Sequence, residues 1–159
     1  MVLDWKCGAA IALAVGVSVA AGGAFALDAQ GQAAATTRHN NFKAQGAAFK
    51  GLLDELKKDT PDKAVIATNA AKLKASAAAL PTWFVKGSGP DDGVKTEAKP
   101  EAFTDAAGFS AAAARLKDET AKLDALAQAG DIAGVKGEVR NVGGACKACH
   151  DKYRVPEKS

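Results

Sequence analysis

The sequence predicts an all-α protein in which four helices form an antiparallel up-down bundle. Four alanine-rich stretches carry apolar residues three and four positions apart, which is the spacing of one helix face. No run of alternating β-branched residues is long enough for a strand. Short breaks join the first stretch to the second and the third to the fourth, whereas residues 81–100 form one long connection. Short connections favour antiparallel neighbours.

Residues typical of a helix N-terminus separate the first two expected helices. The first runs from about Gln32 to Lys58, and the second follows Thr60 as N-cap and Pro61 as first helical residue, ending before Pro81. The first helix has an inward stripe in four-three alternation: Ala35, His39, Phe42, Gly46, Phe49, Leu53 and Leu56. The second is expected to direct Val65, Asn69, Leu73 and Leu80 inward.

The last two expected helices have the clearest patterns. The third follows Thr104 and Asp105, and the break Ala129-Gly130-Asp131 ends it with a glycine and caps the next with an aspartate. Inward positions of the third are Phe109, Ala113, Leu116, Leu123 and Leu126. Those of the fourth are Ile132, Val135, Val139, Val142, Cys146, Cys149 and Tyr153.

The last expected helix contains the motif Cys-x-x-Cys-His at Cys146, Cys149 and His150. This is the spacing of c-type haem attachment: two thiols three positions apart share a helix face and reach one edge of the ring, and the histidine ligates the iron. A structural zinc site needs about four ligands, and the remaining Cys7 and His39 are remote. The motif therefore predicts one haem c, bound covalently near the C-terminus and largely buried, with His150 as metal ligand.

The first 26 residues have the features of a signal peptide. Residues 1–6 are short and polar, residues 7–24 are apolar and uncharged, and Ala24-Phe25-Ala26 supplies a small-x-small cleavage pattern. Residues 27–159 would then form the bundle domain. Export agrees with haem c, which bacteria attach outside the cytoplasm. The alternative is an uncleaved anchor, which would attach the protein to a membrane through residues 7–26.

The charge pattern excludes nucleic acid as a partner. The formal net charge is +3, and the lysines are spread among acidic residues instead of forming a stripe. No acid–base pair or nucleophile is evident. We therefore do not expect an enzyme whose side chains carry out a reaction.

Several segments resemble the cytochromes c′, class II c-type cytochromes of bacterial periplasms. Residues 142–154 resemble the family's haem helix, and residues 86–90, 94–96, 99–103 and 107–109 resemble its loop and the start of its third helix. Arg38 followed by Phe42 resembles its first-helix motif. The resemblance covers essentially all of residues 27–159.

The resemblance implies a periplasmic four-helix bundle, often a homodimer, with His150 as proximal iron ligand. It also implies positions for other residues around the haem. These are Arg38 at a propionate, His39 at the haem edge, Phe42 over the distal face, Glu97 over the haem edge, and Arg154 beside the proximal face.

The group opposite His150 decides the function. Low-spin members of the class place a methionine there, but the single methionine of this chain is Met1, and Phe42 has no lone pair. We therefore expect five-coordinate, high-spin iron in an apolar distal pocket that binds O₂ poorly. The resemblance implies binding of NO and CO, with or without one-electron transfer to an unknown periplasmic redox partner.

Two alternatives remain open. His39 lies one turn before Phe42 on the expected inward stripe, and its imidazole is a good iron ligand. Ligation by His39 would make the protein a low-spin electron carrier. Anchoring through residues 7–26 would instead make it the haem subunit of a membrane redox complex.

Overall fold

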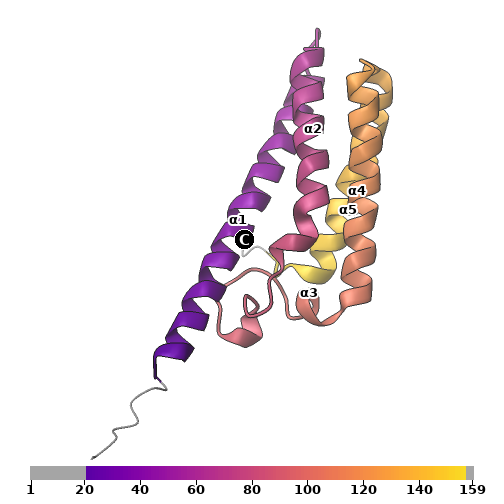
Figure 1. Cartoon of the computed structure of the whole chain (residues 1–159). Helices are drawn as coiled ribbons and strands as arrows, with labels where there is room; N and C mark the ends of the chain where they lie inside the picture. Colours follow the sequence, from indigo (N-terminus) through magenta and orange to yellow (C-terminus); the bar gives the residue numbers. More distant parts are fainter. Residues whose placement is uncertain (1–20, 157–159) are drawn as a thin grey trace, which may run out of the picture.

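The computed structural model describes residues 21–156, and within them it contains helices and no β-strand. Four long helices make up the bundle: α1 (Ala21–Leu56), α2 (Lys63–Ala79), α4 (Ala106–Gln128) and α5 (Ile132–Tyr153). The long connection contains two 3₁₀ turns, η1 (Leu80–Trp83) and η2 (Pro90–Asp92), and one short helix, α3 (Glu101–Thr104). Figure 1 shows the four long helices running alternately up and down. The predicted antiparallel bundle is confirmed.

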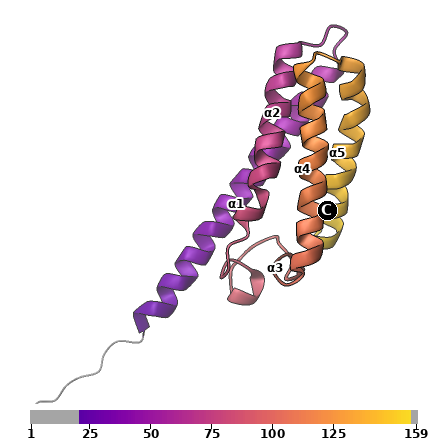
Figure 2. The same cartoon turned by 45° about the vertical axis from the view of Figure 1, so that its right-hand side comes forward.

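The helix α1 stands apart from α4 and α5. It packs along α2, whereas it touches α5 only slightly. In Figures 1 and 2, the N-terminal half of α1 leans away from the other long helices, and the long connection lies at that end of the bundle. The bundle is therefore packed closely from α1 to α2, from α2 to α4 and from α4 to α5, whereas α1 and α5 contact each other only slightly.

The pair formed by α4 and α5 follows the predicted pattern closely. The expected inward residues are buried, except that Leu126, Ile132, Cys146 and Cys149 are only partly buried. Gly130 adopts a left-handed conformation with φ 69°, which ends α4. The Asp131 carboxylate then caps α5 by accepting a hydrogen bond of 2.9 Å from Gly134 N.

The face that α1 buries differs from the expected stripe. His39 and Gly46 are exposed, so the expectation that they point inward is wrong. Arg38 and Gln45 are buried in their place, 3 % and 8 % exposed. The helix is rotated relative to its apolar pattern because Arg38 finds polar partners inside the bundle that compensate for its burial.

The start and inner face of α2 also differ from expectation. The N-cap is Asp62 and not Thr60: its Oδ1 accepts hydrogen bonds from Ala64 N and Val65 N at 2.8 and 3.2 Å. Near the start of α2 the buried face differs by one residue from the expected one: Val65 is 39 % exposed and Ile66 is fully buried. Farther along, Asn69 is half-buried, and Leu73 and Leu80 are buried as expected. The end of α2 agrees with expectation: the helix stops at Ala79, before Pro81, which lies in the first turn of η1.

The long connection packs against the N-terminal half of α1. Gln32 and Lys95 exchange two hydrogen bonds of 3.1 and 3.3 Å between side chain and backbone. Beside them α1 passes so close to the connection that a Cβ at Gly31 would overlap the carbonyl oxygen of Gly87. A glycine is therefore needed at position 31.

No helix within residues 21–156 is long and apolar enough to cross a lipid bilayer. Residues 1–20 lie outside the described part of the chain, and the predicted cleavage point after Ala26 falls within the bounds of α1. The signal peptide therefore stays a prediction.

Candidate haem site

The two cysteines of the motif lie on the core-facing side of α5. Cys146 and Cys149 are free thiols, partly buried against the hydrophobic core. Cys146 lies one turn after Val142 and two turns after Val139. Burial raises the pKa of both thiols, and the neighbouring Cys146 sulfur raises that of Cys149 further. The helix therefore presents two uncharged S–H groups on one apolar face, which suits addition to the two vinyl groups of one ring.

His150 follows Cys149 in the last turn of α5. Its ring is exposed, and its carbonyl oxygen accepts a hydrogen bond of 3.0 Å from Arg154 N, which closes the helix. The backbone of the expected iron ligand is thus held in regular helix up to the end of α5.

The chain beyond His150 is tied to the long connection. Arg154 pairs with Glu97, with 3.2 Å between Nη2 and Oε2, although the two residues are 57 positions apart. Backbone hydrogen bonds run from Val155 N to Glu97 O at 2.8 Å and from Lys99 N to Tyr153 O at 2.9 Å. Two residues expected beside the haem, Glu97 and Arg154, are therefore brought together at this end of α5.

A second tie was not expected from the sequence. The carboxylate of Asp105, the N-cap of α4, accepts hydrogen bonds from Lys152 Nζ at 2.6 Å, from Tyr153 Oη at 2.9 Å and from Gly108 N at 3.0 Å. These donors lower the pKa of Asp105 to about 2, with Lys152 the largest cause. The only advance signal was the Asp105 N-cap itself, because Lys152 and Tyr153 are more than 40 positions away.

Phe42 and Phe49 are seven positions apart and therefore share one side of α1, and Phe49 contacts α5. The Phe42 ring meets the Trp83 ring edge-on, with centroids 5.1 Å apart, and the Phe84 ring at 6.3 Å. The Phe49 ring approaches α5 so closely that its Cζ would lie 3.6 Å from a Cβ at Gly143. Because the helices are antiparallel, this contact sets their register: each turn back from Phe49 meets a later turn of α5. Phe42 is thus level with the last turns of α5, where His150 lies.

Arg38 is a buried positive charge with neutral partners. It donates to Ser88 Oγ, Ser88 O and Thr96 Oγ1 at 2.8–2.9 Å, and to Trp83 O at 3.3 Å. Within the described residues, none of its partners is a carboxylate, and burial lowers its pKa. A buried guanidinium without a counter-charge suits a site that receives an acidic group from a cofactor, as a haem propionate would be.

His39 does not join this site in the structure. It follows Arg38 on α1, but its side chain is exposed, whereas Phe42 is partly buried. Of the expected haem neighbours, the structure thus places Phe42 and Arg38 toward the interior, and His39 outside it.

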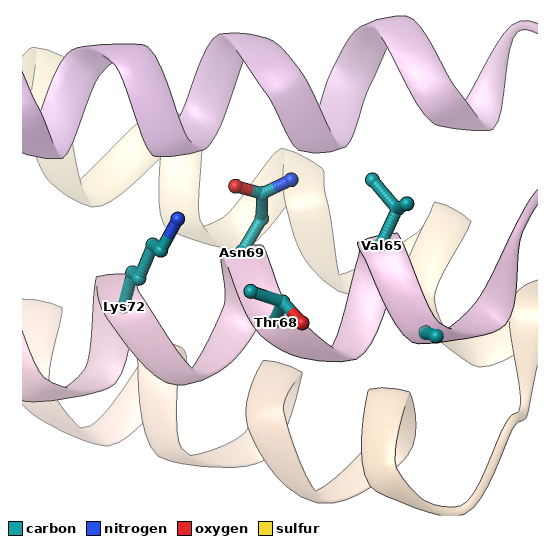
Figure 3. Close-up of a pocket in the computed structure, with 5 residues that line it drawn as sticks. Val65, Thr68, Asn69 and Lys72 are labelled. Carbon is teal, nitrogen blue, oxygen red and sulfur yellow. The ribbon is translucent and has the colours of Figure 1, made fainter.

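Two surface hollows lie elsewhere. One, of about 280 Å³, runs along α2; Figure 3 shows Val65, Thr68, Asn69 and Lys72 on its wall. The other, of about 520 Å³, opens beside Phe84, Phe103 and Phe109, at the start of α4. Neither of these two is lined by the motif cysteines.

Taken together, the side chains fit a covalent haem. The two thiols share one buried face, a histidine follows them directly, apolar rings face them from α1, and a buried cation lacks a counter-charge. The helices that would enclose the ring, α1 and α5, touch each other only slightly.

Comparison with known proteins gives the same answer. The model of the family "Cytochrome C'" matches residues 33–154. A cytochrome c' of Rubrivivax gelatinosus is 40 % identical, over 77 % of this chain and 89 % of its own length. A ferrous variant of cytochrome c prime from Alcaligenes xylosoxidans, solved with bound NO, has a TM-score of 0.69 and 30 % identity, covering 78 % of this chain and 94 % of that one.

A further crystal structure, of a cytochrome c' with ligand-controlled dimer dissociation, has a TM-score of 0.72 at 26 % identity, covering 79 % of this chain and 97 % of that one. Members of the matched family carry one covalent haem c, and Cys146 and Cys149 are the cysteines that attach it here. They bind gases or transfer electrons and are not enzymes in the usual sense. Because the family match extends from the first helix to the end of the haem helix, this chain belongs to the cytochrome c′ family.

Proposed function

We propose that this protein acts in the periplasm as a five-coordinate haem c protein that binds NO and CO, transfers single electrons, or does both. When bound, the haem supplies an iron with an open position and a one-electron couple. His150 is its proximal ligand, and the side chain facing that open position is Phe42. The proposal rests chiefly on Phe42, the ring that α1 directs toward the last turns of α5.

Phe42 is held in place by other rings. Trp83 packs against it edge-on at 5.1 Å, and Phe84 lies behind at 6.3 Å. Such aromatic pairs stabilise one arrangement by about 1 kcal/mol each beyond their burial. A fixed ring with no lone pair cannot ligate iron, and its bulk admits only small molecules.

The charged neighbours have roles outside the distal pocket. Arg38 compensates one propionate while it holds Ser88 and Thr96 of the long connection. Glu97 and Arg154 pair at the edge of the site and brace the turn beyond His150. His39 lies at the solvent-facing rim of the haem, in keeping with its exposed ring.

The relatives support the gas-binding part of the proposal. One from Alcaligenes xylosoxidans was solved with bound NO, and in another the dissociation of a dimer is controlled by a ligand. We extend both properties to this chain: a homodimer whose iron takes up NO. The redox partner is a periplasmic protein of unknown identity.

Absorption spectra of the purified holoprotein test this proposal. A high-spin ferric spectrum, and a ferrous spectrum that changes on addition of NO or CO, are the expected results. The variant His39→Ala should leave both unchanged, because His39 is exposed. A low-spin ferric spectrum that becomes high-spin in His39→Ala would instead establish the electron carrier with two histidine ligands.

The intact mass tests export. A protein that begins at Leu27 and carries one haem is expected. A species that keeps Met1 and sediments with membranes would favour the anchored haem subunit of a redox complex.

A further inference from the structure

Gln45 is a buried polar residue whose role in the fold is not explained by a hydrogen bond from its Nε2. Its side chain is only 8 % exposed, and its Nε2 has no hydrogen-bond partner among the described residues. A buried amide N–H that lacks a partner destabilises the folded state, because it has lost its hydrogen bonds to water without replacement. Such a group in a native core calls for an explanation.

The position of Gln45 on α1 directs it toward the haem site. It lies one turn before Phe49, whose ring contacts α5, and one turn after Phe42, which shares a side of α1 with Phe49. It also lies seven residues from Arg38 and from Leu52, and all three are buried, so they form one seam along the inside of the helix.

The alignment of α1 with α5 determines which turn of α5 lies opposite Gln45. Phe49 meets α5 at Gly143, one turn before Cys146. The antiparallel course therefore sets Gln45 opposite the turn that begins with Cys146, and Phe42 opposite the turn that ends with His150. Long side chains in a helix lean toward its N-terminus, so the Gln45 amide reaches back toward the level of Phe42.

We infer that the Gln45 amide is a hydrogen-bond donor of the distal pocket, with the N–H of Nε2 directed at a diatomic ligand that enters beside Phe42. The inference rests on the proposed function and deepens it. It also revises the expectation of a wholly apolar distal pocket: Phe42 restricts the size of the ligand, and Gln45 adds polarity. Distal donors are one of the features by which a haem protein selects among O₂, NO and CO.

Carbon monoxide is the probe for the test, because its stretching frequency reports on nearby donors. The ferrous holoprotein is compared with Gln45→Leu, which keeps an apolar side chain of similar size. Methionine is avoided at this position because its sulfur can ligate iron. The matched control is Gln128→Leu, an exposed glutamine on α4.

We expect Gln45→Leu to raise the C–O stretching frequency and to speed CO dissociation about two- to tenfold, the range that one hydrogen bond supplies. The urea midpoint of the ligand-free holoprotein should not fall, since the variant removes an unpartnered buried amide. Gln45→Asn, which withdraws the amide by one methylene, should give an intermediate frequency even if the leucine variant folds poorly. Gln128→Leu should match the parent.

A parent that binds CO, with both Gln45 variants identical to it in frequency and dissociation rate, overturns the inference and leaves the proposed function intact. A parent with a low-spin spectrum that takes up no CO overturns the proposed function, and the inference with it.

Discussion

The pair α4–α5 and the pair formed by α1 and the long connection are held together in different ways. Leu123, Val135 and Val142 are fully buried between neighbouring helices, so apolar packing holds the first pair. The second pair relies on polar contacts, with Arg38 bonded to Ser88 and Thr96. The haem site lies between a side fixed by apolar periodicity and a side fixed by specific polar partners. Mutations in the two sides should therefore have different effects.

The largest loss of stability is expected from a mutation in the apolar core between α4 and α5. Leu123→Ala removes a side chain that is 0 % exposed and leaves a cavity, which should lower the free energy of unfolding by about 3 kcal/mol. Urea denaturation of the holoprotein measures this change. Leu126→Ala, on the same helix but only partly buried, should cost clearly less. Equal losses in the two variants would contradict the description of this side as a packed core.

The next largest loss of stability is expected from a mutation in the polar contacts between α1 and the long connection. Arg38→Leu removes four hydrogen bonds to the connection and should cost about 2 kcal/mol. Hydrogen exchange should become faster in residues 83–96, while the amides of α4 keep their protection. Arg115→Leu, at an exposed position on α4, is the control and should change neither quantity. Uniformly faster exchange in all helices would remove the distinction between the two sides.

The smallest effect concerns the ionic tie that joins the start of α4 to the end of α5, within the first pair of helices. The pKa of Asp105 is lowered from 3.8 to about 2 in the folded protein, chiefly by Lys152. A depressed carboxyl pKa stabilises the fold above pH 3.8, and this contribution is lost as the pH falls toward 2. Asp105→Asn should therefore flatten the decline in stability over this pH range while it keeps an N-cap for α4.

Unfolding curves at several pH values measure this loss. Asp118→Asn, an exposed position farther along α4, should keep the slope of the parent protein. If Asp105→Asn also keeps the slope, Asp105 does not contribute to stability through its charge.

The two sides also differ in how far the sequence predicts them. The stripe from Val135 to Tyr153 and the break at Gly130 were predicted correctly, because period and turn chemistry are local properties. The inner face of α1 was not, because Arg38 is buried through partners 45–58 positions away that no local pattern shows. The start of α2 was misplaced because Thr60 and Asp62 are both good caps, and Glu55 accepts a hydrogen bond of 2.8 Å from Asp62 N, which favours the later one.

The residues of the candidate site also differ in how far the sequence predicts them. The Cys-x-x-Cys-His motif could be found in the sequence, because its chemistry is contained in five consecutive residues. Gln45 could not, since an unpartnered amide is visible only once the surrounding helices are in place. The Asp105 tie was hidden for the same reason, as it joins an N-cap to a tyrosine 48 positions away.

The short antiparallel bridge between Ala98 and Arg154 has a practical consequence. Because Val155 N bonds to Glu97 O and Tyr153 O accepts from Lys99 N, the residues after His150 are held against the long connection. An affinity tag or fusion partner should be appended beyond residue 156. A chain truncated before Val155 would lose one of these hydrogen bonds, and the last turn of α5, which contains His150, should then unwind more easily.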